Sequence, residues 1–282
     1  MQRIVQVCLF GTALAVGTAL TVGTTGCSRS TETTPTELAV TNTYLESIVV
    51  DLLGDQTGII CLTEPGMCPG HFDVRPSQVA RLRTCRLLLR FDFQSALDAK
   101  LAPLADHGLV IAEIRPDGGL STPTAYLDAC RQTAAALIQV GLMSEADADA
   151  RISAIAQRMA ELDSWVRDEV ETAQLAGKRA LSSVHQQGLC EWLGLDVVGT
   201  FRGADTVGVA ELESAVRAGT QAPVILVAAN RAEGRRVADA LADRLDATVV
   251  MLDNFPDRDG GPPRFDTLVR ANVHRLLAAS RP

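Results

Sequence analysis

A long segment without glycine or proline divides this chain of 282 residues into two parts. Between Ser144 and Ala173, apolar side chains recur at steps of three and four residues, which is one face of an α-helix. Ser144 with Asp147 resembles an N-terminal capping box that has Asp in place of Glu. About thirty residues at roughly 1.5 Å each give a helix on the order of 45 Å long, which can run beside two lobes as a spine. The alternative is an ordinary core helix that breaks near Trp165.

Short apolar runs alternate with helical patterns on both sides of this segment. Before it, strands are expected at 38–40, 57–62, 85–91 and 108–114, and helices near 45–53, 95–105 and 125–140. After it, strands are expected at 179–184, 195–201, 223–229 and 247–252, and helices near 186–193, 209–218, 233–245 and 267–279. This alternation is typical of parallel sheets that helices cover on both faces. The sequence therefore predicts an α/β fold of two parallel-sheet lobes joined by one long spine helix, with a ligand cleft between the lobes.

The first residues have the pattern of a secretory signal. Arg3 is followed by apolar and small residues from 4 to 22, and Cys27 follows a glycine, as in the bacterial lipoprotein signal that this segment resembles. Thr24 replaces the leucine that usually stands three residues before the cysteine, so an ordinary cleaved signal is the alternative. Lipidation at Cys27 would hold the protein at a membrane surface. The polar residues 27–36 are expected to form a tether.

Composition indicates a globular protein whose partner is not a nucleic acid. Hydrophobic residues make up 47% of the chain, which excludes disorder, and the net charge is 26 − 34 = −8 without any block of basic residues. No apolar stretch long enough to span a membrane follows the first thirty residues. The expected division is a signal peptide at 1–26, a tether at 27–36, an N-terminal α/β lobe at 37–142, the linking spine helix at 143–177, and a C-terminal α/β lobe at 178–282.

Cysteine usage leaves the disulfide pattern open. Five cysteines fall in the globular part, and these are Cys61, Cys68, Cys85, Cys130 and Cys190. Cys61 and Cys68 are close enough in sequence to pair around one loop. The alternative is that they are small buried apolar residues. Because the chain has no Cys-x-x-Cys pair, a thiolate zinc cluster is not expected.

Three side chains that can bind a metal ion stand just past predicted strand ends. His71 follows the second strand, His185 directly follows the strand that ends at 184, and Asp253 directly follows the strand that ends at 252. Ligands of parallel sheets bind at the carboxyl ends of the strands. Two imidazoles and a carboxylate that face one another across a cleft can coordinate a divalent ion. For any single histidine, a structural or surface role is the ordinary alternative.

Two sequence motifs in these regions resemble those of the substrate-binding proteins of ABC importers for zinc and manganese. The stretch GHFDVRPSQV at 70–79 is similar to the first-lobe motif of that family, although it is one residue shorter after the histidine. The stretch SVHQQG at 183–188, followed by WLGLDVVG at 192–199, has the outline of the second-lobe motif. The resemblance covers about residues 38–280, and it implies that His71, His185 and Asp253 are metal ligands.

The chain also departs from the family pattern. Thr124 stands where the family usually has a further histidine before the long helix, and a neutral hydroxyl is a poor ligand for zinc or manganese. The turn after the third strand carries Asp92 and Gln94 in place of the family residues. The possible additional ligands are Asp92, Gln94, Thr124 and Asn254, or water. Which metal binds, and whether metal binding is retained at all, stays open.

The resemblance implies an extracytoplasmic substrate-binding lipoprotein, not an enzyme, that captures a divalent metal of the zinc or manganese class. Its expected partners are an ABC permease and, through a lipid anchor, the membrane; a monomer in the cell envelope and no organic cofactor are expected. One alternative is a member of the family that lost the ion and has a structural or adhesive role. A metallohydrolase, in which the ion activates water, is a further alternative, although no evident general base stands near these positions.

Overall fold

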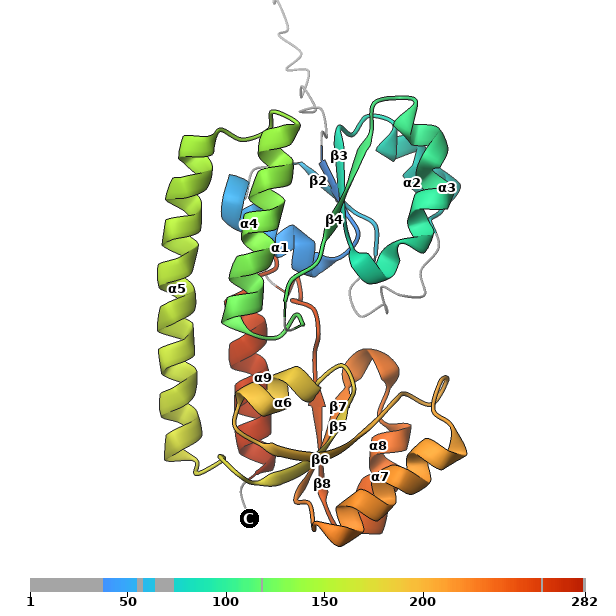
Figure 1. The fold of residues 1–282 in the computed structure, drawn as a ribbon, viewed down its shortest axis with the longest axis vertical. Coiled ribbons are helices and arrows are strands. Elements are labelled where there is room, and N and C mark those ends of the chain that lie inside the picture. Colours follow the sequence, from blue (N-terminus) through green and yellow to red (C-terminus); the bar gives the residue numbers. More distant parts are fainter. Residues whose placement is uncertain (1–37, 55–57, 64–73, 118, 260, 281–282) are drawn as a thin grey trace, which may run out of the picture. The chain divides into compact units, whose positions relative to one another are not determined.

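The chain passes through a first lobe, along one long helix, and through a second lobe (Figure 1). This computed structural model describes residues 38–54, 58–63, 74–117, 119–259 and 261–280. The first lobe consists of β1 (Leu38–Val40), α1 (Thr43–Leu53), β2 (Ile59–Cys61), α2 (Pro76–Leu82), β3 (Leu87–Phe91), the 3₁₀-helix η1 (Asp92–Gln94), α3 (Ala96–Ala105), β4 (Val110–Ile114) and α4 (Pro123–Gln139). After α5 (Glu145–Thr172), the second lobe consists of β5 (Arg179–Ser183), α6 (Gln187–Trp192), β6 (Asp196–Phe201), α7 (Val209–Gln221), β7 (Leu226–Asn230), η2 (Arg231–Glu233), α8 (Arg236–Leu245), β8 (Thr248–Leu252) and α9 (Phe265–Ala279).

Each lobe is built on a parallel sheet of four strands. The first sheet has the order β2-β1-β3-β4 and the second has the order β6-β5-β7-β8. Every pair of neighbouring strands is parallel. The predicted α/β fold of two parallel-sheet lobes is therefore confirmed.

The segment predicted as a spine is a single α-helix of 28 residues, α5. Ser144 caps it, because its Oγ accepts a hydrogen bond from the backbone N of Asp147 at 3.1 Å and donates one to the Asp147 carboxylate at 2.6 Å. In a standard capping box the acidic side chain bonds the backbone N–H of the cap residue instead. The helix continues past Trp165, so the alternative of a broken helix is wrong.

One hydrophobic core runs through both lobes along α5. It contains residues from α1, α4, α5 and α9 and from the inner faces of both sheets, among them Leu45, Leu87, Leu137, Leu162, Leu226 and Leu276. Two smaller cores lie on the outer faces, under α2 and α3 in the first lobe and under α7 and α8 in the second (Figure 1). In β3, Leu87 and Leu89 belong to the shared core while Leu88 belongs to an outer one. This alternation is what a strand buried on both faces requires.

A buried carboxylate fastens α1 to the helices around it. The side chain of Asp51 is 1% exposed and accepts a hydrogen bond from Tyr126 Oη at 2.6 Å. It also forms ion pairs with Arg158 of α5 and with Arg264, the residue before α9, whose Nη1 lies 3.1 Å from Asp51 Oδ1. Because α9 belongs to the second lobe, this cluster joins the two lobes at α1.

Several sequence predictions fall outside the described residues or differ from the structure. His71, Cys27 and Cys68 lie outside them, as do the predicted signal peptide and tether. The sequence did not predict α2, a helix of seven residues. Cys61, Cys85, Cys130 and Cys190 are free thiols, so Cys61 is not part of a disulfide. Among the helices that the structure describes, none is long and apolar enough to cross a bilayer.

Candidate functional site

Side chains that can bind a ligand gather at one edge of the second sheet, where its parallel strands end. His185 lies two residues beyond β5, Glu233 lies in η2 after β7, and Asp253 directly follows β8. Because the strands run in the same direction, their ends meet at this edge. Gln186 Nε2 donates a hydrogen bond to Asn254 Oδ1 and so ties the turns after β5 and β8 together. The structure thus places His185 and Asp253 at strand ends, as the sequence predicted.

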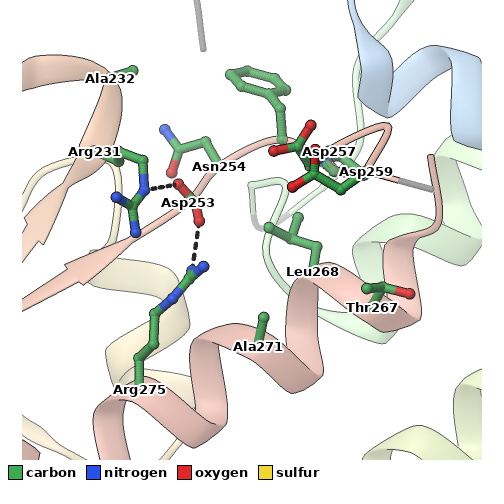
Figure 2. Close-up of a pocket in the computed structure, with 12 residues that line it drawn as sticks. Arg231, Ala232, Asp253, Asn254, Asp257, Asp259, Thr267, Leu268, Ala271 and Arg275 are labelled. Atoms are coloured by element: carbon green, nitrogen blue, oxygen red, sulfur yellow. Dashed lines mark hydrogen bonds and ion pairs between the residues drawn. The ribbon is translucent and has the colours of Figure 1, made fainter. Parts of the chain in front are cut away.

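A cavity of about 280 Å³ lies beside Asp253, between the turn after β8 and the helix α9 (Figure 2). Arg231, Asp253 and Arg275 form part of its wall, and Phe255, Leu268 and Ala271 contribute apolar surface. The cavity is large enough for a small polar ligand.

Two arginines hold the carboxylate of Asp253. Arg231 Nε donates to Oδ1 at 2.6 Å, and Arg275 Nη1 donates to Oδ2 at 2.5 Å (Figure 2). The backbone is held as well, because Asp253 N donates to Asn272 Oδ1 at 3.0 Å and Asn272 Nδ2 donates to Asp253 O at 2.8 Å. Each carboxylate oxygen thus already has a cationic partner. A divalent ion at Asp253 would have to displace a guanidinium group or bind against its repulsion.

A second carboxylate, Glu233, lies beside the imidazole of His185. Glu233 Oε1 is 3.6 Å from His185 Nε2 and accepts a hydrogen bond from the backbone N of Gly203 at 3.1 Å. Glu233 Oε2 accepts a hydrogen bond from Ser183 Oγ at 2.7 Å. The Glu233 side chain is 15% exposed, whereas that of His185 is 52% exposed. In this pair, hydrogen bonds therefore fix the carboxylate of Glu233, and the imidazole of His185 is exposed to solvent.

Glu233 is not among the predicted site residues, because the helix predicted at 233–245 includes it as its first residue. In the structure, α8 begins only at Arg236, and Glu233 belongs to the turn after β7. Its position just past a strand end is the same signal that identified His185 and Asp253. That signal would have found Glu233 had the helix been predicted to begin three residues later.

Asp92 and Gln94, two of the possible additional ligands in the first lobe, have other partners. Arg115 Nε lies 3.3 Å from Asp92 Oδ2. Gln94 is buried, and its Oε1 accepts hydrogen bonds from Thr41 Oγ1 at 2.7 Å and from the backbone N of Phe91 at 3.0 Å. Thr124 is exposed in the first turn of α4. Gln94 therefore stabilises the turn after β3, and Asp92 is neutralised by an arginine.

Within the described ranges, no group of three or more His, Cys, Asp or Glu side chains is arranged to hold a metal ion. At this edge of the second sheet, the described residues that can donate to a metal ion include the pair of His185 and Glu233, and Asp253 with its two arginines. A metal site here would need a donor from elsewhere in the chain, and His71 is the one that the sequence predicts.

Solved structures share this fold, whereas no protein-family model and no curated protein matches the chain. ZnuA is 13% identical, with 88% of this chain and 100% of that chain covered and a TM-score of 0.73. A mutant of the Mn-bound periplasmic metal binding protein from Candidatus Liberibacter asiaticus is 12% identical, with 86% and 99% covered and a TM-score of 0.72. A mutant of the laminin-binding adhesin Lmb from Streptococcus agalactiae is 13% identical, with 87% and 100% covered and a TM-score of 0.72.

At these identities the likeness is one of fold. It extends over nearly the whole described chain and includes both lobes. The predicted resemblance is confirmed at the level of the fold, which this chain shares with ZnuA and with a Mn-bound periplasmic metal binding protein.

Proposed function

We propose that this protein is an extracytoplasmic substrate-binding protein that captures a divalent metal, of the zinc or manganese class, for an ABC importer. The observation that carries the proposal is the fold, two parallel-sheet lobes and a long helix, which it shares with a Mn-bound periplasmic metal binding protein and with ZnuA. A ZnuA deletion mutant with zinc bound has the same fold. The position of His185 at the carboxyl edge of the second sheet supports it.

The ligand set that we propose is His71, His185 and Asp253. Two imidazole nitrogens and carboxylate oxygens are donors that zinc and manganese both accept. An ion at Asp253 must either displace Arg231 or Arg275 from one oxygen or bind beside their positive charges. We expect metal binding to be weaker for this reason than at a site whose carboxylate has no cationic partner.

The proposed location is the cell envelope, outside the cytoplasmic membrane. The signal-like pattern of residues 1–26 supports export, and lipidation of Cys27 would anchor the protein as a monomer near its permease. Metabolic labelling with a radioactive or alkyne fatty acid tests the anchor. We expect label on the wild-type chain and none on Cys27→Ser.

Calorimetric titration of the metal-free protein tests metal capture. We expect zinc or manganese to bind at one site, and His185→Ala to weaken binding at least tenfold, since the substitution removes one of a few ligands. His107→Ala is the matched control, because His107 is exposed in the turn before β4, at the amino-terminal edge of the first sheet. A wild-type protein that takes up neither ion would refute the proposal.

A second candidate function is a structural or adhesive role that needs no ion. It is favoured by the two arginines on Asp253 and by Thr124 in the place of a family histidine. The laminin-binding adhesin Lmb has the same fold. Because a ligand that binds only the native state must stabilise it, a melting temperature unchanged by excess zinc and manganese would favour this candidate.

A further inference from the structure

We propose that Glu233 is the carboxylate that binds the metal cargo together with His185. This inference rests on the proposed function, since it names a further ligand of the same site. The pair lies at the carboxyl edge of the second sheet, one strand away from Asp253. The sequence alone does not show that Glu233 lies beside His185.

The distance within the pair suits a shared ion. The separation of 3.6 Å between His185 Nε2 and Glu233 Oε1 exceeds the normal length of a hydrogen bond. Two donors that each lie about 2.0–2.1 Å from a tetrahedral zinc ion are about 3.4 Å apart. An ion can therefore bridge these atoms with a shift of only a few tenths of an ångström.

The carboxylate is also held in place before any ion arrives. Ser183 Oγ donates to one oxygen, and the backbone N of Gly203 donates to the other. A Cβ added at Gly203 would lie 2.7 Å from Glu233 Cβ, so only glycine allows this approach. Since each carboxylate oxygen has two lone pairs, both hydrogen bonds leave Oε1 able to bind a cation. A donor fixed in this way loses little conformational freedom when the ion binds.

The neighbouring charges favour cation binding at Glu233 over cation binding at Asp253. Asp253 shares its two oxygens with Arg231 and Arg275. In the described part of the chain, Glu233 has no arginine or lysine partner; its contacts are a hydroxyl, a backbone N–H and an imidazole. A cation at Glu233 therefore displaces no guanidinium group.

Zinc titrations of matched variants test the proposal on the full-length protein. Glu233→Gln keeps the shape and removes the charge; its amide oxygen can accept from Gly203 N, and its NH2 group can donate to Ser183 Oγ, which reverses that bond. Gly203→Ala keeps the charge but moves the side chain. We expect each to raise the dissociation constant for zinc about 10- to 100-fold. Glu211→Gln is the control, since Glu211 is a partly buried carboxylate that pairs with Arg202 at the start of α7, and it should leave the dissociation constant within twofold.

An infrared difference spectrum separates a ligand from a residue that only orients His185. Zinc-minus-apo spectra of the wild type and of Glu211→Gln should share a pair of carboxylate stretching bands, separate from any bands of Asp253, that Glu233→Gln lacks. Weaker binding with these bands retained would show that Glu233 acts on His185 without touching the ion, and would overturn the proposal. Wild-type affinity in Glu233→Gln would overturn it as well, whereas absence of zinc binding in the wild type would overturn the proposed function itself.

Discussion

Two carboxylates at the edge of the second sheet differ in the charges that surround them. Asp253 is bound by Arg231 from the turn after β7 and by Arg275 from α9, while Glu233 is bound by neutral donors. This difference affects the binding of a divalent cation. The interaction energy of two unit charges 4 Å apart is about 1 kcal/mol in water and about 4 kcal/mol near a protein surface. The arginines therefore compete with the cargo at Asp253.

Removing one competitor should strengthen metal binding. We expect Arg231→Gln to lower the dissociation constant for zinc roughly 3- to 10-fold, since it frees Oδ1 of Asp253 and removes a positive charge. Arg235→Gln is the control, because that guanidinium group pairs with Asp239 on the exposed face of α8. Titration calorimetry of the two variants measures the effect. Equal affinities in both would show that Asp253 does not take part in binding.

The buried carboxylate of Asp51 stabilises the fold. Asp51→Asn would leave Arg158 and Arg264 facing a neutral amide. Because both arginines are partly exposed and Arg158 keeps Asp266 as a partner, the cost should be about 1–3 kcal/mol, below that of breaking a fully buried ion pair. We expect urea unfolding to show a loss of this size. Asp239→Asn is the matched control, since Asp239 is exposed, and it should change the free energy of unfolding far less. A loss as small as that of the control would contradict the role of Asp51 as a buried link.

The thiol of Cys61 should react slowly at neutral pH. Burial, aided by the charge of Glu46 and opposed by Arg258, raises the pKa of Cys61 to about 11. Because the thiolate is the reactive form, alkylation of the native protein should be slow at pH 8 and should accelerate as the pH rises towards 10. The same cysteine in urea, where its pKa is near 8.5, is the control. Mass spectrometry of the Cys61 peptide measures both rates, and equal rates at pH 8 would contradict the raised pKa.

Residue-level features were the hardest to predict from the sequence. The positions of His185 and Asp253 after strands follow from the apolar runs that precede them. The arginines on Asp253 do not, because Arg231 and Arg275 are each 22 residues away along the chain in opposite directions. Only the folded arrangement of η2 and α9 brings them together. The position of Glu233 beside His185 likewise depends on a residue distant in sequence, Gly203, whose backbone N donates to the Glu233 carboxylate.

At the scale of elements, apolar periodicity predicted the strands and the longer helices to within a few residues. Most strands of these sheets contain a short apolar run, as β3 does, and α5 has a regular apolar face of buried residues. The exception is α2, which begins at Pro76 and buries only Leu82. A helix with one buried residue has no periodic pattern to detect, and its start is marked only by the proline at its first position.

The continuity of α5 should make its centre sensitive to proline. Ala160 is exposed near the middle of this helix, so Ala160→Pro changes the backbone without disturbing the core. The substitution removes one backbone hydrogen bond and forces the proline ring against the carbonyl of Ala156, at a cost of about 3 kcal/mol or more. Ala160→Ser is the control and should cost less than 1 kcal/mol. Urea unfolding measures both, and equal stabilities would mean that α5 is already interrupted there.

At the scale of the whole described chain, the two lobes share one core. Leu45 of α1 and Leu226 of β7 belong to the same cluster, which continues through α5 and α9. The sequence predicted two lobes and the helix between them. It did not predict the shared core, because periodicity shows that a helix has an apolar face but not which sheets that face meets. A core that crosses from lobe to lobe makes independent unfolding of either lobe unfavourable.

Unfolding should therefore be a single transition. Leu45→Ala in the first lobe and Leu226→Ala in the second should each lower the free energy of unfolding by about 2–5 kcal/mol, since each leaves a cavity in the same core. Tryptophan fluorescence, from Trp165 in α5 and Trp192 in α6, should change at the same urea concentration as far-ultraviolet circular dichroism in every variant. If Leu45→Ala shifted the circular dichroism alone, the lobes would be unfolding separately and the core that α5 spans would not couple them.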